Sequence, residues 1–322
     1  MDKMSDPVSG QVLPVERDKP STGKRKTGHL ITRIVWLASI VLAVGATAWA
    51  VWTSVRSLRE YHFNWGMLGV ALAVRMGALL MIVYLWNAIL SRMGGRRSLR
   101  RDFKLYCFTN IAKRLPTPLW LVNGRIVLYE KETGSDPLRI SVSTGLEILL
   151  TLVSGLVVSL LFLPCGMPGL SIHIKALAIV LAFLVLSVFS SPRPLSWLGE
   201  KIGRLIRQDI QLYHIRWYDL LYWNILYALS WAVGGVILYF LVGALLPVTW
   251  SLLPRLIWAW AVSGLVGFVR FLIPFFFAAR ELSLAVIIAP FVPLPLAIVI
   301  AALSRLCLIA GDLLGILLSW LA

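Results

Sequence analysis

The feature that most limits what this chain can fold into is a series of long, nearly uncharged apolar runs. Several exceed about 18 residues, the length that an α-helix needs to cross a hydrocarbon core of roughly 30 Å. Apolar residues fill 59% of the 322 positions and charged residues only 14%, against roughly 45–50% and 25% in soluble domains. The sequence therefore predicts an all-α, polytopic membrane protein.

About six transmembrane helices are expected. Their predicted ranges are 34–55, 67–90, 138–164, 174–190, 219–246 and 295–319. The first run follows Lys24, Arg25 and Lys26, a basic flank that also precedes signal-peptide cores, but its length favours a retained span. Residues 1–28 are polar and are predicted to form a disordered cytoplasmic tail. Residues 29–322 are predicted to form a single transmembrane domain.

Positive charge is distributed unevenly along the chain, whose net charge is +16. Seven Lys and Arg residues precede the first span, six lie in 92–104 and five in 191–218, whereas the connections on the other side carry about four in all. The positive-inside rule places the basic segments in the cytoplasm. We therefore expect a multi-pass protein of a prokaryotic inner membrane with cytoplasmic N- and C-termini. No basic face on a soluble module is evident, so no nucleic-acid partner is expected.

Two segments between the spans are interrupted by proline. In 103–131, Pro116 and Pro118 divide the segment into limbs of about 12 residues, too short to cross a membrane. Proline breaks a helix, so the segment is predicted to be a re-entrant hairpin; the alternative is an amphipathic helix on the cytoplasmic surface. A second irregular unit, 254–291, is broken at Pro274.

The basic segment 191–218 has a helical pattern of its own. Leu195 and Ile202 recur at helical spacing, while Lys201 and Arg204 lie on the other side. This pattern predicts an interfacial amphipathic helix on an anionic cytoplasmic leaflet.

The two halves of the chain, about 30–165 and 172–322, repeat one order of elements: two spans, a proline-broken unit, and a span with a charge near its middle. Counting the membrane crossings places the two broken units on opposite sides. This is an inverted repeat, which in many transporters surrounds a site at the membrane midplane. Repeat symmetry alone does not establish transport.

Five charges within the apolar regions are the predicted substrate-binding residues. They are Arg125, Glu147, Arg280, Glu281 and Arg305. A charge at the bilayer centre costs at least about 2.5–3.5 kcal/mol, so it usually faces a cavity or a partner. Arginine binds phosphate through two parallel hydrogen bonds, and the glutamates would hold the arginines apart or bind a cationic group. The alternative is that Glu147 and Arg305 pair with charges of the broken units only to fix the fold.

Other polar positions give weaker signals. Arg75 lies within the second span and is able to snorkel to the interface, and Asp312 lies one heptad after Arg305. No catalytic residue, cofactor or metal is predicted, because phosphate-loop and nucleophile-elbow motifs are absent. The histidines have no ligand spacing; they are His29, His62, His173 and His214.

The first broken unit carries a recognisable arrangement of residues. The run from Arg114 to Trp120, then Gly124-Arg125, then a span with Glu147 resembles the transmembrane region of lysylphosphatidylglycerol synthases. The resemblance covers most of residues 30–320. It implies the flippase part of that family, which moves lipid headgroups between leaflets. The cytosolic aminoacyl-transferring domain is missing, so synthase activity is not implied.

The second broken unit resembles the same family from Pro274 through Arg280-Glu281 and on to the Arg305 span. In the family this motif is usually glycine-rich before the Arg-Glu pair, and here the range 275–277 holds three phenylalanines instead. Phenylalanine rings would crowd a headgroup that approaches the backbone closely.

Three functions follow as hypotheses. The leading one is a lipid translocase, or flippase-like protein, that acts on membrane lipids with an anionic or modified headgroup and is not an enzyme. The second is a non-transporting partner of a lipid-modifying or glycosyl-transferring enzyme, and the third is an integral-membrane enzyme that acts on a lipid. A homo-oligomer is compatible with each. A polar cavity at mid-depth favours transport, whereas a filled, charge-paired centre favours the partner.

Overall fold

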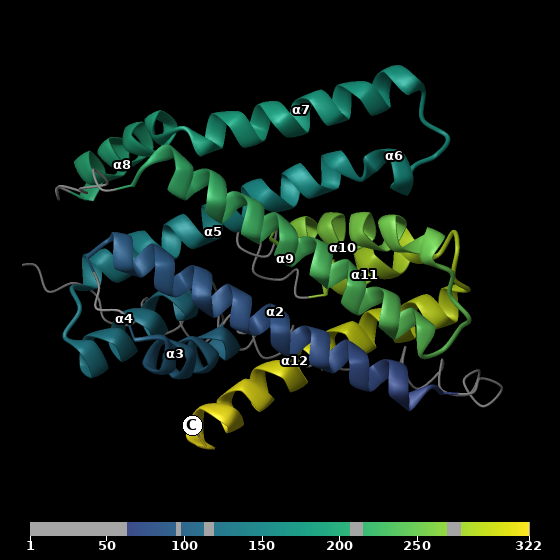
Figure 1. The fold of residues 1–322 in the computed structure, drawn as a ribbon, viewed down its shortest axis with the longest axis horizontal. Coiled ribbons are helices and arrows are strands. Elements are labelled where there is room, and N and C mark those ends of the chain that lie inside the picture. Colours follow the sequence, from purple (N-terminus) through teal and green to yellow (C-terminus); the bar gives the residue numbers. More distant parts are fainter. Residues whose placement is uncertain (1–62, 95–97, 113–118, 207–214, 269–277, 322) are drawn as a thin grey trace, which may run out of the picture. The chain divides into compact units, whose positions relative to one another are not determined.

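The computed structural model describes residues 63–94, 98–112, 119–206, 215–268 and 278–321. Every element among them is a helix, as the apolar pattern predicts (Figure 1). The α-helices are α2 (Trp65–Arg92), α3 (Leu99–Ala112), α4 (Leu119–Thr133), α5 (Pro137–Leu161), α6 (Leu163–Gly166), α7 (Ile172–Ser190), α8 (Pro192–Ile206), α9 (Trp217–Gly243), α10 (Leu253–Gly267), α11 (Ala279–Ile288) and α12 (Leu294–Leu321). A 3-10 helix, η1 (Trp250–Leu252), precedes α10.

Five of the described helices, α2, α5, α7, α9 and α12, are long and apolar enough to cross a membrane. They match the expected spans from the second to the sixth, with ends that differ by a few residues. The membrane class is therefore confirmed at this level. The first expected span, 34–55, and the predicted tail, 1–28, lie outside the described residues.

The ends of these helices follow from local sequence. Asn64 caps α2, because its side-chain oxygen accepts a hydrogen bond from the backbone N–H three residues on, at 3.2 Å. Asp136 caps α5 by accepting a hydrogen bond from the backbone N–H two residues on, at 3.2 Å, and Pro137 begins the helix, where its missing N–H is no loss. Gly134 follows α4 with a φ of +63°, a conformation that glycine adopts without strain and that commonly ends a helix.

Helices α2 and α9 lie side by side in opposite directions and are fastened at both ends (Figure 1). At one end the backbone N–H of Asn64 donates to the carbonyl of Ala244, at 2.8 Å. At the other end Arg92 Nη2 lies 2.7 Å from Asp219 Oδ1. We call these the Ala244 end and the Arg92 end of the pair.

Two pairs of short helices lie at opposite ends of this central pair. The first short pair consists of α3 and α4; because α3 follows α2 and α4 precedes α5, this pair is connected at the Arg92 end (Figure 1). The second short pair consists of α10 and α11; because α10 follows α9 and α11 precedes α12, this pair is connected at the Ala244 end. The four helices contain 14, 15, 15 and 10 residues, so none of them spans the membrane alone. The expected turn residues Pro116, Pro118 and Pro274 lie outside the described residues.

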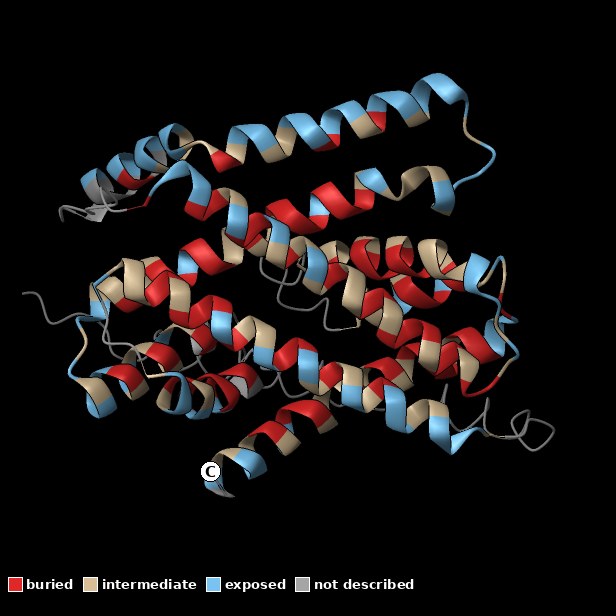
Figure 2. Cartoon of the chain, in the orientation of Figure 1, coloured by how far each residue is buried: buried red, intermediate tan, exposed pale blue. Residues whose placement is uncertain are grey.

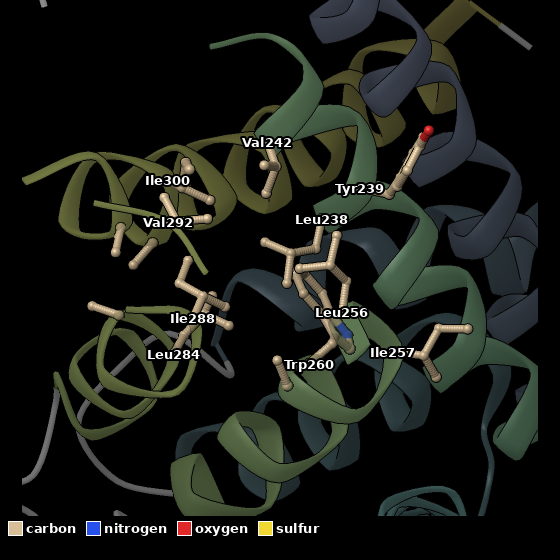
Figure 3. Close-up of a cluster of buried hydrophobic side chains, with 14 of the residues drawn as sticks. Leu238, Tyr239, Val242, Leu256, Ile257, Trp260, Leu284, Ile288, Val292 and Ile300 are labelled. Atoms are coloured by element: carbon tan, nitrogen blue, oxygen red, sulfur yellow. The ribbon is translucent and has the colours of Figure 1, made fainter. Parts of the chain in front are cut away.

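The largest buried apolar cluster joins α9 to the second short pair and α12 (Figure 3). Leu238 of α9 and Trp260 of α10 lie in one cluster with Leu284 and Ile288 of α11, and Ile300 of α12 belongs to the same cluster. Because lipid tails are as apolar as these side chains, close packing rather than the hydrophobic effect holds such helices together in a membrane.

One close approach depends on two glycines. Trp231 of α9 lies between Gly155 of α5 and Gly264 of α10, and its ring occupies the space in which a Cβ at either glycine would lie. Its indole N–H donates to the carbonyl of Thr151, at 3.0 Å. The ring therefore fastens three helices at one point.

Helices α7 and α8 form the least buried part of the described chain (Figure 2). Small residues, Ala178 and Ala182, pack α7 on its neighbours, while large apolar residues such as Phe183 are exposed. In α8, Leu195 packs against a buried cluster while Lys201 and Arg204 face outward. The amphipathic character predicted for this segment is present in the described side chains.

The Trp231 contact generates a stability prediction. Gly264→Ala adds a methyl group that overlaps the indole ring, and overpacking of this kind costs about 1–3 kcal/mol. Thermal unfolding in detergent should therefore shift to a lower midpoint. Gly145→Ala on α5 is the matched control, because a Cβ there meets nothing. A midpoint that is unchanged in Gly264→Ala would contradict the packing described.

Candidate functional site

Two of the predicted site residues form a fully enclosed ion pair. Helix α4 carries Arg125 and α5 carries Glu147, and Arg125 Nη1 donates to Glu147 Oε2. The hydroxyl of Tyr106, from α3, donates to the other carboxylate oxygen at 2.7 Å. Arg125 is 0% and Glu147 2% exposed. The first short pair is thus joined to a transmembrane helix by charge.

Aromatic rings surround the guanidinium of this pair. Arg125 Cζ lies 4.1 Å from the ring centroid of Trp86 and 4.6 Å from that of Tyr106, within the range of a cation–π interaction. The Trp86 indole N–H donates to the hydroxyl of Tyr129 at 2.6 Å, which fixes the ring. Nε and Nη2 of Arg125 have no hydrogen-bond partner among the described residues. The arginine therefore retains donors that its glutamate does not use.

A second ion pair joins the second short pair to α12. Glu281 Oε1, on α11, lies 3.4 Å from Arg305 Nη1. This pair is looser than the first, since the Glu281 side chain is 18% and the Arg305 side chain 35% exposed. Arg305 lies roughly 16 Å along α12 from its beginning, a depth at which an accessible arginine needs water or a polar partner.

Arg280 precedes Glu281 and packs on the neighbouring helix. Its guanidinium carbon lies 4.4 Å from the ring centroid of Trp260 on α10. Gly267 lies against its stem, because a Cβ there would approach Arg280 Cβ to 3.0 Å. The five predicted residues thus fall into two groups: one on α4 and α5, the other on α11 and α12.

The pairing of Glu147 and Arg305 with charges on the short helices matches the structural alternative stated for them from sequence. That pairing does not decide whether the residues also bind a substrate, which stays a prediction.

Arg75 does not snorkel to the interface. It is buried, and its Nη2 lies 2.5 Å from Asp312 Oδ1, which also accepts from Asn110 Nδ2 at 2.8 Å. The Arg75 stem lies where a Cβ at position 311 would be, so Gly311 makes room for it. The partners of Asp312 join α12 to α2 and α3.

Sequence reasoning missed another buried polar contact. The amide of Asn87 on α2 donates to the carboxylate of Asp102 on α3, and both residues are buried. Asn87 lies within the apolar run predicted as the second span. Its place inside an apolar run was the available signal, because a buried amide needs a partner. Tyr106 and Trp86 carry no comparable signal, since aromatic residues are common in such helices.

The described residues contain no group of three or more side chains suited to hold a metal ion. No protein-family model matches the chain, and no match was found among curated proteins or among solved structures.

The two ion pairs differ in enclosure, which predicts different costs of breaking them. Glu147→Gln leaves the buried Arg125 charge without compensation and should lower the free energy of unfolding by about 3–5 kcal/mol. Glu281→Gln should cost about 1 kcal/mol or less, because solvent reaches that pair. Denaturant unfolding in detergent micelles measures both. Glu200→Gln, on the exposed face of α8, is the control. Equal losses in the two variants would contradict the difference in enclosure.

Proposed function

We propose that this chain is a lipid translocase, flippase-like and not an enzyme, that moves a lipid with an anionic or modified headgroup across the membrane. The observation that carries the proposal is the pair of Arg–Glu contacts. Each joins the second helix of a short pair to the following transmembrane helix, at Arg125–Glu147 and at Glu281–Arg305. Charges in such positions are expensive and commonly mark a substrate path.

The chemistry of these pairs suits an anionic headgroup. A phosphate offers several acceptor oxygens, and arginine binds it through parallel, charge-assisted hydrogen bonds. The Arg125 donors that have no partner within the described part of the chain supply such bonds once Glu147 is displaced. At the other pair, the accessible surface of Arg305 leaves room for a headgroup to approach. One closed pair and one accessible pair suit a protein that opens its two halves in turn.

Packing supports the inverted repeat on which this mechanism depends. In the repeat α2 corresponds to α9, α3 to α10, α4 to α11 and α5 to α12. Helix α5 packs on α9 and α10, and its counterpart α12 packs on α2 and α3. Helices α2 and α5 are in contact, and so are α9 and α12. Replacing each helix by its counterpart in the other half therefore gives the same set of contacts.

The numbering supports the same correspondence. Arg75 packs where Gly311 lacks a Cβ, and Trp231 packs where Gly155 lacks one. Arg75 and Trp231 are 156 positions apart (75 to 231), as are Gly155 and Gly311 (155 to 311). The two helix contacts thus use a large side chain and a glycine at corresponding places.

The charged pairs show the same separation of 156 positions only in part. Arg125 and Glu281, the members carried by α4 and α11, are also 156 positions apart (125 to 281). Their partners Glu147 and Arg305 are 158 apart (147 to 305). The charges are reversed between the halves, so the halves present different ions to a substrate.

The second candidate is a non-transporting partner of a lipid-modifying or glycosyl-transferring enzyme. The complete enclosure of Arg125 and Glu147 favours it, because a filled, paired centre fixes a fold without passing a substrate. The two candidates make opposite predictions for lipid movement.

Transfer of fluorescent anionic phospholipid in proteoliposomes tests the proposal. The wild-type chain should move the lipid faster than empty vesicles do. Arg305→Gln and Arg280→Ala should each lower the rate roughly tenfold or more, the effect of losing a charged hydrogen bond. Lys131→Gln, on the exposed part of α4, is the control and should keep the wild-type rate. Wild-type vesicles that are no faster than empty ones would leave the partner hypothesis standing.

We propose an inner-membrane orientation with the Arg92 end in the cytoplasm, and thiol labelling tests it. Cys165 is exposed in the connection at the Ala244 end, while Cys107 and Cys307 are buried. A membrane-impermeant maleimide should label Cys165 in intact spheroplasts. In a Cys165→Ser background, Ser196→Cys on α8 should react only after permeabilisation. The reverse pattern would invert the orientation.

A further inference from the structure

One buried carboxyl group differs from the others in what it contacts. Four acidic residues are buried within the described part of the chain: Asp102, Glu147, Asp219 and Asp312. The last three each form an ion pair with an arginine of another helix. Asp102 is 1% exposed and forms no ion pair with any described residue. Because a buried carboxylate without a cation is costly, its surroundings favour the neutral acid.

The neighbours of Asp102 are neutral side chains from two helices. The Asn87 amide of α2 donates to the carboxyl group, and the Tyr129 hydroxyl of α4 lies against the same group. Helix α12 also packs on α3, but its Asp312 meets Asn110, which is roughly 12 Å along α3 from Asp102. An amide and a hydroxyl form hydrogen bonds with a carboxylate and with a carboxylic acid alike, so the site accommodates either state of the group.

Burial and charge act on this carboxyl group in opposite directions. Burial raises the pKa of Asp102 above its usual range. The hydrogen bonds from its two neighbours and the positive charge of Arg101 lower that pKa by a smaller amount. Asp102 lies in the first turn of α3, and the connection before α3 is at the Arg92 end. About one helical turn, roughly 5 Å, therefore separates the carboxyl group from the beginning of its helix.

A short chain of contacts joins this carboxyl group to the enclosed Arg125–Glu147 pair. The hydroxyl of Tyr129 accepts the indole N–H of Trp86 at 2.6 Å, and the Trp86 ring centroid lies 4.1 Å from Arg125 Cζ. Tyr129 also follows Arg125 by one turn on α4. An ionised Asp102 holds the Tyr129 hydroxyl by a charge-assisted hydrogen bond, and protonation weakens that bond. The state of the acid therefore acts on the groups that position the guanidinium.

We propose that Asp102 is a proton-binding site that gates the enclosed ion pair, so that lipid moves faster when the proton is bound. The neutral acid holds Tyr129 weakly, and Arg125 then leaves Glu147 for a headgroup. When the proton returns to water, the carboxylate draws Tyr129 back and the pair closes. The gating of lipid movement rests on the proposed translocation, whereas the proton site depends only on these helices.

Infrared spectroscopy of the detergent-purified full chain tests the proton site without any transport. The C=O band of protonated carboxyl groups should contain a component that persists above the ordinary aspartate range, about pH 4, and disappears as the pH rises further. Asp102→Asn should lack this component. Tyr129→Phe and the control Glu200→Gln, on the exposed face of α8, should retain it. A component that is still present in Asp102→Asn, or one that does not change with pH, would overturn the proposal.

Lipid transfer measured against pH tests the gating. Proteoliposomes hold the same buffer on both sides, so the orientation of the protein does not affect the result, and the probe is a fluorescent phosphatidylglycerol. Once the pH exceeds the Asp102 midpoint, the wild-type rate should fall by up to about tenfold per pH unit. Asp102→Asn, which imitates the neutral acid, should keep a fast rate at every pH. Tyr129→Phe should lose the response although its carboxyl group still titrates.

Controls separate the gating from loss of the fold and from loss of translocation. Thermal unfolding midpoints verify that each variant is folded, and Glu200→Gln should follow the wild type at every pH. A wild-type rate that does not depend on pH, or a dependence that persists in Asp102→Asn, would overturn the gating. Wild-type vesicles that are no faster than empty ones at any pH would contradict the translocation and its gating together. The infrared titration then decides the proton site by itself, so the two failures are distinguishable.

Discussion

A guanidinium and a carboxylate that meet away from water are the interaction on which the rest of this structure depends. Arg125 and Glu147 are both enclosed, so each carries a desolvation cost that their pairing helps to offset. Tyr106 adds a hydrogen bond and, with Trp86, an aromatic surface. The contact fixes α4 against α5.

The second short pair is held against its transmembrane helix in a different way. Glu281 and Arg305 join α11 to α12 with more room around them, and the apolar cluster of α9 to α12 carries more of the packing. A translocase needs one half that opens more easily than the other at any moment. The contrast between the enclosed and the accessible pair is the difference on which the proposed translocation rests.

The sequence predicted the five described spans well because the length and polarity of an apolar run are local properties. It also indicated segments too short to span, in which the structure has α3 and α4 and, in the second half, α10 and α11; the prolines expected to divide them lie outside the described residues. It did not predict which charges meet. Arg75 and Asp312 are 237 positions apart, and their contact depends on how α2 and α12 are rotated and on the space left by Gly311. The aromatic surroundings of Arg125 depend in the same way on the packing of α2 and α3. Such rotations are set by tertiary contacts that no local pattern contains.

A double-mutant cycle on Arg125→Gln and Glu147→Gln tests the central interaction most directly. Unfolding free energies of the wild type, both single variants and the double variant, measured in the same detergent, give the coupling between the two side chains. An enclosed pair predicts a coupling of about 2 kcal/mol or more, with the double variant more stable than the sum of the single losses implies. Additive losses, with a coupling near zero, would contradict the account.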